Sequence, residues 1–356
     1  MIGLNIAAVD IFCGIGGLTH GLIKAGIPVV AGIDIDETCK YAYETNNDSY
    51  FIHADVTNLE SKEVSDLYPE GCIKILVGCA PCQPFSPHTQ KDKKRAENEK
   101  WKLLYSFSKL IQDVQPDIVS AENVPAIARS KVFTDFIAEL EGLGYYVFWD
   151  KVYCPEYGVP QSRKRLVLLA SKFGPIDIIP ATHSQDKYET VRDRIGGLEA
   201  IGAGEISDED PLHRTSHLTD INLRRIKQSK PGGTWKDWDE DLVSPCHKKE
   251  TGESYSGVYA RMSWDNLAPT ITTQFYNYGT GRFGHPEQDR ALSLREGALL
   301  QSFPKDYDFI DPELQFSVKR LGIHIGNAVP VDLGVVIGRS ILNHLEGILY
   351  GRKNGE

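Results

Sequence analysis

The chain has 356 residues, 41% of them hydrophobic and 25% charged. This is the composition of a globular protein, and it excludes a wholly disordered chain or a collagen-like repeat. At roughly 100–200 residues per domain, the length predicts two domains or one large one. No apolar run reaches about 18 residues and the N-terminus lacks a basic segment, so we expect neither a membrane span nor a signal peptide.

The formal net charge is −10, which argues weakly against a nucleic-acid binder because a local basic patch matters more than the total. Seven cysteines, an odd number, occur without a secretion signal. This predicts reduced thiols and a cytoplasmic location.

Short apolar runs alternate with helical patterns through the first half of the chain. We expect strands at residues 6–12, 28–35, 50–56, 73–77, 117–121, 145–153 and 166–170, and helices at 18–25, 37–45, 101–114 and 133–143. This alternation predicts an α/β fold with a doubly wound, mostly parallel sheet. From about residue 175 the periodicity weakens, which predicts a second, smaller, irregular domain before a final helix at 331–345.

Several chemically capable residues fall at or just after the ends of the expected strands. They are the glycine-rich loop, Asp34, Cys82 and Glu122. Sites in doubly wound sheets form at the carboxyl ends of the strands. We therefore expect these residues to gather along one edge of the sheet.

The glycine-rich loop Asp10-Ile-Phe-Cys-Gly-Ile-Gly-Gly17 lets the backbone approach a ligand at a helix N-terminus. Thr19 stands where the nicotinamide fingerprint needs its third glycine, so that pattern fails. Asp34 lies about 20 residues downstream, where an acid accepts ribose hydroxyls. A nucleotide-like cofactor is favoured over a tight turn without a ligand.

Cys79 and Cys82 have C-x-x-C spacing, which allows three interpretations. Pro84 fits poorly with the helix of a redox pair, and no second ligand pair supports zinc. Cys82 as a single nucleophile therefore competes with an inert thiol. Glu122 is either a solvated acid or a desolvated proton donor.

Basic residues allow a similar choice. Strand alternation predicts that Arg163 and Arg165 lie on one face and Lys164 on the other. The two guanidiniums could bind a phosphate or a carbonyl oxygen, or they could mark a solvated strand entry. The basic segments 88–102 and 214–236 suit a phosphate backbone or a solvated surface.

Taken in order, these motifs resemble those of the cytosine-C5 DNA methyltransferase family. The resemblance covers nearly the whole chain except about residues 176–266, where the family has its variable target-recognition region, and Ala80 departs from the proline of many members. The matching segments are residues 10–17, Pro81-Cys82-Gln83, Glu122-Asn123-Val124, Gln161-x-Arg163-x-Arg165, residues 290–304 and Gly326-Asn327-Ala328-Val329-Pro330.

The resemblance implies a DNA (cytosine-5-)-methyltransferase with a Rossmann-like fold, of the prokaryotic restriction-modification or orphan type. It implies that Cys82 adds to C6 of a flipped cytosine in a short duplex sequence. Glu122, kept protonated by its site, then supplies a hydrogen bond at N3, Arg165 holds the O2 carbonyl, and Arg163 holds the loop or a phosphate. The implied catalytic domain is 1–175 plus 318–356, and the implied target-recognition domain is 176–317.

The same resemblance implies the ligands. S-adenosyl-L-methionine, leaving as S-adenosyl-L-homocysteine, is expected to contact Phe12, Gly14, Gly16, Gly17, Leu18, Asp34, Ile35, Asp55, Val56, Pro81, Asn327 and Ala328. Double-stranded DNA is expected to contact Gln83, Ser86, Arg224, Arg225, Thr270 and Ile271. We expect a monomer in the bacterial cytoplasm, associated with the nucleoid, with no metal and no membrane. A cognate restriction endonuclease acting on the same site is expected to form no stable complex with it.

Three rival hypotheses make different predictions. The first is that the chain methylates cytosine in transfer RNA, as a related branch of the family does. The recognition region of this sequence lacks the Cys-Phe-Thr signature of that branch. A thiol oxidoreductase predicts that replacing Cys79 abolishes activity, whereas the methyltransferase interpretation predicts tolerance. A DNA-binding module without catalysis predicts that Cys82→Ala leaves function intact.

Overall fold

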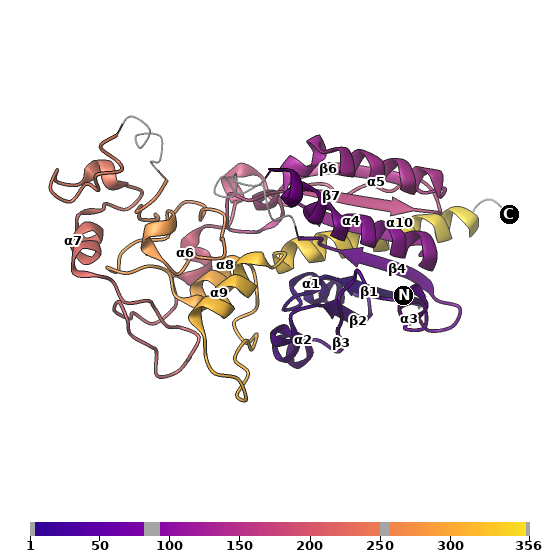
Figure 1. Ribbon diagram of the computed structural model, residues 1–356, viewed down its shortest axis with the longest axis horizontal. Coiled ribbons are helices and arrows are strands. Elements are labelled where there is room, and N and C mark those ends of the chain that lie inside the picture. Colours follow the sequence, from indigo (N-terminus) through magenta and orange to yellow (C-terminus); the bar gives the residue numbers. More distant parts are fainter. Residues whose placement is uncertain (1–3, 82–92, 250–256, 354–356) are drawn as a thin grey trace. The chain divides into compact units, whose positions relative to one another are not determined.

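The computed structural model describes residues 4–81, 93–249 and 257–353, which form two compact units (Figure 1). Unit 1 comprises Met1–Tyr153, Lys164–Ala181 and Val329–Glu356, and unit 2 comprises Cys154–Arg163 and Thr182–Ala328. The expected first domain included residues 154–163 and 318–328, which instead group with unit 2. Helix α9 (Val318–Asn327) packs against α8 (Leu294–Leu300), which accounts for the second of these differences.

Unit 1 is built on a seven-stranded sheet of order β3-β2-β1-β4-β5-β7-β6. Only β7 runs antiparallel to its neighbours, so the predicted α/β class with a mostly parallel sheet is confirmed. The strands are β1 Ile6–Ile11, β2 Val29–Asp34, β3 Tyr50–His53, β4 Ile73–Gly78, β5 Ile118–Asn123, β6 Tyr146–Tyr153 and β7 Lys164–Ser171.

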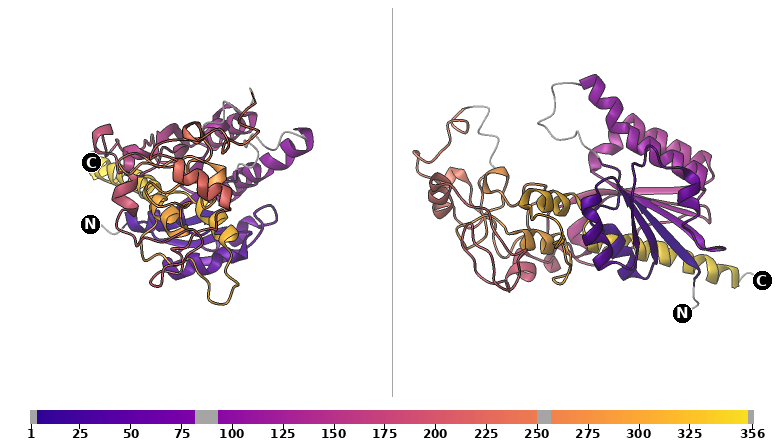
Figure 2. Two further views of the ribbon diagram at one scale, coloured as in Figure 1. Left: turned by 90° about the vertical axis from the view of Figure 1, so that its left-hand side faces the viewer. Right: turned by 60° about the horizontal axis from the view of Figure 1, so that its bottom comes forward.

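Helices cover both faces of this sheet, with α4 and α5 on one side and α10 on the other (Figure 2). The helices of unit 1 are α1 Gly17–Ala25, α2 Lys40–Asn46, α3 Ser61–Ser65, α4 Lys93–Val114, α5 Lys131–Gly142 and α10 Val331–Lys353, with 3-10 turns at Glu37–Cys39 and Pro125–Arg129.

The alternation of side chains along β1 divides the core. Ala7, Val9 and Ile11 belong to the apolar cluster that includes buried residues of α4 and α5. Asp10 points to the opposite face, where its carboxylate meets Thr19 of α1. Cys79 and Glu122 contact one another at the ends of β4 and β5. The polar groups therefore lie at and beside the carboxyl edge, as the sheet topology predicts.

Unit 2 is irregular, as the weak periodicity predicts. Its described residues contain short helices and isolated β-bridges, and a small core forms around Ile226, Trp235, Trp238 and Tyr278. Its helices are α6 Val191–Ile195, α7 Asp220–Gln228, α8 and α9, with 3-10 turns at Cys154–Tyr157, Gln185–Lys187, Trp235–Asp237 and Tyr278–Thr280.

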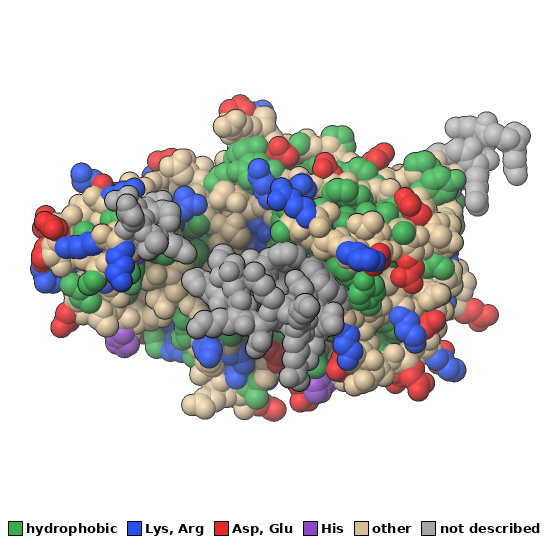
Figure 3. All heavy atoms as spheres, turned by 45° about the horizontal axis from the view of Figure 1, so that its top comes forward, with side chains coloured by type: hydrophobic (Ala, Val, Ile, Leu, Met, Phe, Trp, Pro, Cys, Tyr) green, Lys and Arg blue, Asp and Glu red, His purple; other side chains and the backbone are tan. Residues whose placement is uncertain are grey.

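One stretch, Val318–Leu349, is long and apolar enough to pass for a membrane span, with a mean hydropathy of 1.5. It includes α9 and most of α10. Of its most apolar 18-residue segment, 78% is buried inside the protein, as in the core helix of a globular protein. On the face drawn in Figure 3, Lys and Arg side chains lie among Asp and Glu side chains. Despite the net charge of −10, this face is therefore not uniformly acidic.

Candidate active site

The loop between β1 and α1 has an unusual backbone. Phe12, Gly14 and Gly16 have φ angles of 64°, 50° and 83°, and α1 begins directly afterwards at Gly17. Glycine adopts this left-handed region without strain, whereas Phe12 does so at a cost of order 1–3 kcal/mol. A Cβ on Gly14 would meet no atom within 4 Å, so there is open space beside the loop.

Asp34, at the end of β2, fastens this loop. Its Oδ2 accepts the Gly14 N–H at 2.9 Å, and its Oδ1 accepts the Asp36 N–H at 2.9 Å. Ile35 is 64% exposed beside it, an unusual position for a large apolar side chain. The acid and the exposed apolar group thus lie together after β2, next to the glycine loop.

Asp55 and Val56 follow β3, the next strand of the sheet. Hydrogen bonds from the backbone N–H and the hydroxyl of Thr57 lower the pKa of the Asp55 carboxyl, so it is ionised at neutral pH. Val56 is buried and packs in the core of unit 1. Leu18, in the first turn of α1, is also buried.

Glu122 is the most enclosed acid at the end of the central strands, with only 4% of its surface exposed. Its Oε1 lies 2.8 Å from Nε of Arg165 on β7, although the described residues give Oε1 no aligned hydrogen bond. Its Oε2 accepts the thiol hydrogen of Cys79 at 2.7 Å. The structure therefore brings together two of the predicted catalytic residues, Glu122 and Arg165, and adds Cys79.

The segment after β4 is tied to β5. Asn123 Nδ2 donates to the carbonyl of Ala80 at 3.1 Å, and Pro81 is exposed immediately afterwards. The predicted residues Cys82, Gln83 and Ser86 lie outside the described residues. The bond between Asn123 and Ala80 fixes the point from which that segment departs.

Arg163 belongs to unit 2 and is almost fully buried. Its guanidinium donates to the carbonyls of Ile271 and Ala328, at 3.2 and 3.5 Å. Arg163 lies just before β7, which begins at Lys164, and its side-chain contacts differ from that of Arg165 with Glu122. Arg163 supports the backbone of unit 2, whereas Arg165 pairs with the acid of unit 1.

The predicted DNA contacts Thr270 and Ile271 lie in the same part of unit 2 as Gln161. The Thr270 hydroxyl donates to the carbonyl of Ser162 at 3.2 Å, and the Ile271 N–H donates to Gln161 Oε1 at 3.0 Å. Ile271 is buried. The predicted cofactor residues Asn327 and Ala328 end α9, also in unit 2.

Arg224 and Arg225 of α7 differ in their surroundings. The Arg224 side chain is 63% exposed and pairs with Asp241 at 2.9 Å. Arg225 lies against the rings of Trp238 and Tyr259 and donates to the Leu242 carbonyl, the Asn222 amide oxygen and the Ser244 hydroxyl. Arg224 has the more accessible charge, and Arg225 holds the small core of unit 2 together.

Asp10 is a buried acid beside the site that the sequence did not single out. Its Oδ2 accepts the Thr19 hydroxyl at 2.7 Å, while Oδ1 has no hydrogen-bond partner among the described residues. Burial raises the pKa of Asp10 from 3.8 to about 7. Its stabilising contribution is therefore complete below pH 3.8 and is lost as the pH rises through 7.

This shift predicts a pH-dependent effect of Asp10→Asn. Relative to the variant, wild-type unfolding free energy should fall by about 1.4 kcal/mol per pH unit between pH 4 and 7, because the unfolded chain loses the proton first. Urea unfolding at several pH values measures this difference. The exposed control Asp48→Asn should follow the wild type. Parallel pH dependences of wild type and Asp10→Asn would contradict the assignment.

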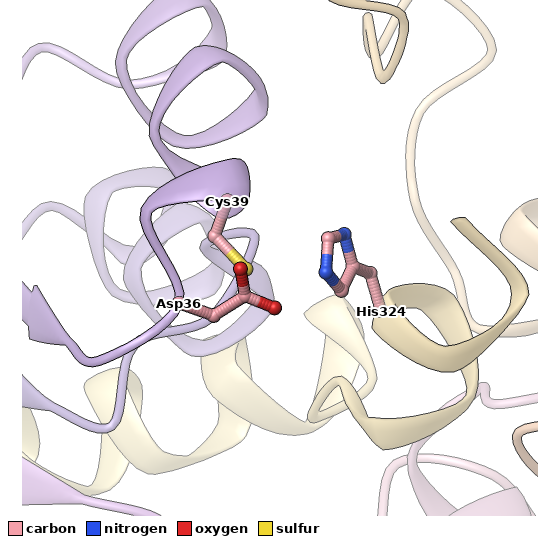
Figure 4. A group of neighbouring side chains, drawn as sticks. All are labelled: Asp36, Cys39 and His324. Carbon is pink, nitrogen blue, oxygen red and sulfur yellow. The ribbon is translucent and has the colours of Figure 1, made fainter. Parts of the chain in front are cut away.

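Asp36, Cys39 and His324 are potential metal ligands (Figure 4). Asp36 and Cys39 belong to unit 1, whereas His324 lies on α9 of unit 2. Asp36 also caps the turn Glu37–Cys39 by accepting the Thr38 N–H, and burial raises the pKa of the Cys39 thiol. We assign no metal site to these side chains.

The chain is similar to known DNA methylases over nearly its whole length. Residues 6–343 match the family model of C-5 cytosine-specific DNA methylases. The type II methylase M.HgiDII of Herpetosiphon aurantiacus is 56% identical over 345 residues, covering 96% of both chains. The type II methyltransferase M.Eco47II of Escherichia coli is 29% identical over 350 residues, which is 95% of this chain and 79% of that protein.

A solved structure shares the fold. It is a DNA modification methyltransferase encoded within a prophage, from Escherichia coli, with a TM-score of 0.71 and 21% identity. The alignment covers 96% of this chain and 99% of that one.

Proposed function

The chain belongs to the C-5 cytosine-specific DNA methylase family and is a DNA cytosine-5-methyltransferase, and from this premise we propose how it acts. It transfers a methyl group from S-adenosyl-L-methionine to C5 of a flipped cytosine in a specific short duplex sequence. The observation that carries the proposal is the buried Glu122 carboxyl, which is paired with Arg165 at the end of β5.

The residues at the carboxyl edge fit the cofactor. The open space beside Gly14 leaves room for a ligand against the loop backbone. Asp34 offers carboxylate oxygens for ribose hydroxyls, the exposed Ile35 offers an apolar surface for adenine, and the ionised Asp55 can accept a hydrogen bond from the adenine amino group. We assign Phe12, Gly16, Gly17, Leu18, Val56 and Pro81 to the same site, and we also assign Asn327 and Ala328 to the cofactor. S-adenosyl-L-methionine, when bound, supplies an electrophilic methyl group on a sulfonium.

The protein's own residues activate the base. Cytosine C5 is a weak nucleophile, so Cys82 Sγ adds to C6 and gives C5 enamine character. Glu122 provides a hydrogen bond at N3, where charge develops, and Arg165 holds the O2 carbonyl. After methylation, loss of the C5 proton and of the C6–Sγ bond restores the aromatic ring.

The two units divide this work. Unit 1 carries the residues assigned to the reacting base and most of those assigned to the cofactor. Unit 2 carries the target-recognition residues, and Arg163 supports its backbone at Ile271 and Ala328. Gln83, Ser86, Thr270, Arg224 and neighbouring residues contact duplex DNA in this assignment. The protein acts as a monomer in the bacterial cytoplasm, and a restriction endonuclease for the same site acts without a stable complex.

Covalent trapping tests the proposed adduct. In duplex DNA amplified with 5-fluorodeoxycytidine, fluorine cannot leave C5 as a cation, so the enzyme should stay attached after methyl transfer. Denaturing electrophoresis should show a cofactor-dependent protein–DNA band for wild type and none for Cys82→Ala. A band of equal intensity with Cys82→Ala, or no band from a protein that methylates ordinary DNA, would overturn the adduct.

A further inference from the structure

Cys79 has no part in the chemistry proposed above, yet it contacts the central acid. It follows β4 directly, and its Sγ lies 2.7 Å from Glu122 Oε2. The register explains the contact, because Gly78 on β4 pairs with Ala121 on β5. Cys79 follows Gly78 and Glu122 follows Ala121, so the two residues lie opposite each other. Their side chains therefore share a face of the sheet.

The thiol of Cys79 is a hydrogen-bond donor at neutral pH. Burial, with the Glu122 charge as a second cause, raises the pKa of this thiol well above its usual value. A neutral thiol can donate one hydrogen, whereas a thiolate would repel the carboxylate. The same protonation makes Cys79 a poor nucleophile and a poor redox partner. The contact with Glu122 therefore gives Cys79 a hydrogen-bonding role that the C-x-x-C spacing does not indicate.

We propose that Cys79 is a positioning residue for methyl transfer: its S–H bond to Oε2 holds the Glu122 carboxyl in the orientation that meets the flipped cytosine. Arg165 approaches the carboxyl at Oε1, and a single contact of this kind leaves rotation about the last side-chain torsion possible. The thiol removes that freedom from the opposite side. This inference rests on the proposed role of Glu122 and revises the tolerance of Cys79 replacement expected from the sequence.

Single-turnover methyl transfer tests the proposal. Cys79→Ala should lower the rate about 10- to 100-fold, the effect of leaving a buried acceptor without its hydrogen-bond partner, with KM for DNA and cofactor within about twofold. Cys79→Ser keeps a donor and should recover the rate to within about threefold. Cys72→Ala is the matched control, since Cys72 precedes the same strand and is expected to have the wild-type rate.

A double-mutant cycle separates positioning from general support of the fold. If Cys79 acts through Glu122, adding Cys79→Ala to Glu122→Gln should change the residual rate by less than about twofold. The full loss on both backgrounds would overturn the proposal. So would wild-type activity in Cys79→Ala, or failure of Cys79→Ser to recover while remaining folded.

A spectroscopic measurement keeps the test independent of activity. The infrared difference between wild type and Cys79→Ala isolates the S–H stretch of this thiol. Glu122→Gln should shift that stretch, because an amide replaces the carboxyl acceptor, whereas an unchanged frequency would overturn the contact. A wild-type protein that transfers no methyl group would contradict the proposed function, while the stretch would still report on the contact between Cys79 and Glu122.

Discussion

Replacing Glu122 by glutamine is expected to slow methyl transfer by about 10²- to 10⁴-fold, the usual effect of losing a positioned proton donor. Glutamine keeps the size of the side chain but cannot carry the proton to N3 of cytosine. Because Glu122 contacts Cys79 and Arg165, and the proposed cofactor residues lie elsewhere, affinity for S-adenosyl-L-methionine should stay within about twofold of wild type.

Single-turnover transfer to duplex DNA measures this effect, with cofactor affinity measured by calorimetry. Glu139→Gln is a suitable control, because Glu139 accepts the Ser108 hydroxyl between α5 and α4 and has no proposed role. A rate within threefold of wild type for Glu122→Gln would remove Glu122 from the reaction.

A buried ion pair in unit 2 is expected to have a large effect on the free energy of unfolding. Glu296 and Arg290 are both fully buried and form a two-pronged ion pair at 2.7 and 2.8 Å. Burial alone would raise the pKa of Glu296, but the charge and hydrogen bonds of Arg290 outweigh it and hold the pKa at about 2. Glu296 also accepts the Ser293 N–H in the capping box of α8.

Glu296→Gln is therefore expected to destabilise the protein by about 3–5 kcal/mol, because Arg290 would keep a buried charge without a partner. Urea unfolding at pH 7 measures this loss, and exposed Glu287→Gln should stay within about 0.5 kcal/mol of wild type. Equal stability of the two variants would contradict the role given to the pair.

The same pair predicts acid sensitivity. The folded-state pKa of Glu296 is depressed from 4.5 to about 2, so its contribution is present above pH 4.5 and is lost as the pH falls towards 2. His285, 3.6 Å from Glu296, adds a further loss of stability at higher pH, between 6.5 and 4. Burial lowers its pKa from 6.5 to about 4, so the unfolded chain takes up a proton first as the pH falls below 6.5.

Much of unit 1 follows from local sequence pattern. Strand β1 and residues 166–170 of β7 are short, mostly apolar and buried, and helices separate the early strands along the chain. The glycine loop, Asp34 and Glu122 could be placed at the strand ends for that reason. The first part of α4, from Lys93, was not predicted because its sequence is polar and charged and lacks apolar periodicity.

Other features depend on tertiary contacts that a sequence pattern does not contain. Helix α9 was not predicted, since glycines such as Gly322 and Gly326 weaken helical propensity. They are required by packing, because a Cβ there would collide with Tyr276 and with the Thr272 backbone. The contact between Cys79 and Glu122 depends on the pairing of β4 with β5, which the C-x-x-C spacing does not reveal. The start of β7 at Lys164 likewise separates Arg163 from Arg165.

Bisulfite sequencing of DNA from a methylation-free bacterial host that expresses this chain would detect the proposed activity itself. We expect protected cytosines in one short sequence context, and their loss in an otherwise identical host that expresses Cys82→Ala. Unprotected DNA, with soluble wild-type protein shown to bind S-adenosyl-L-methionine, would contradict the claim that this chain methylates cytosine in duplex DNA.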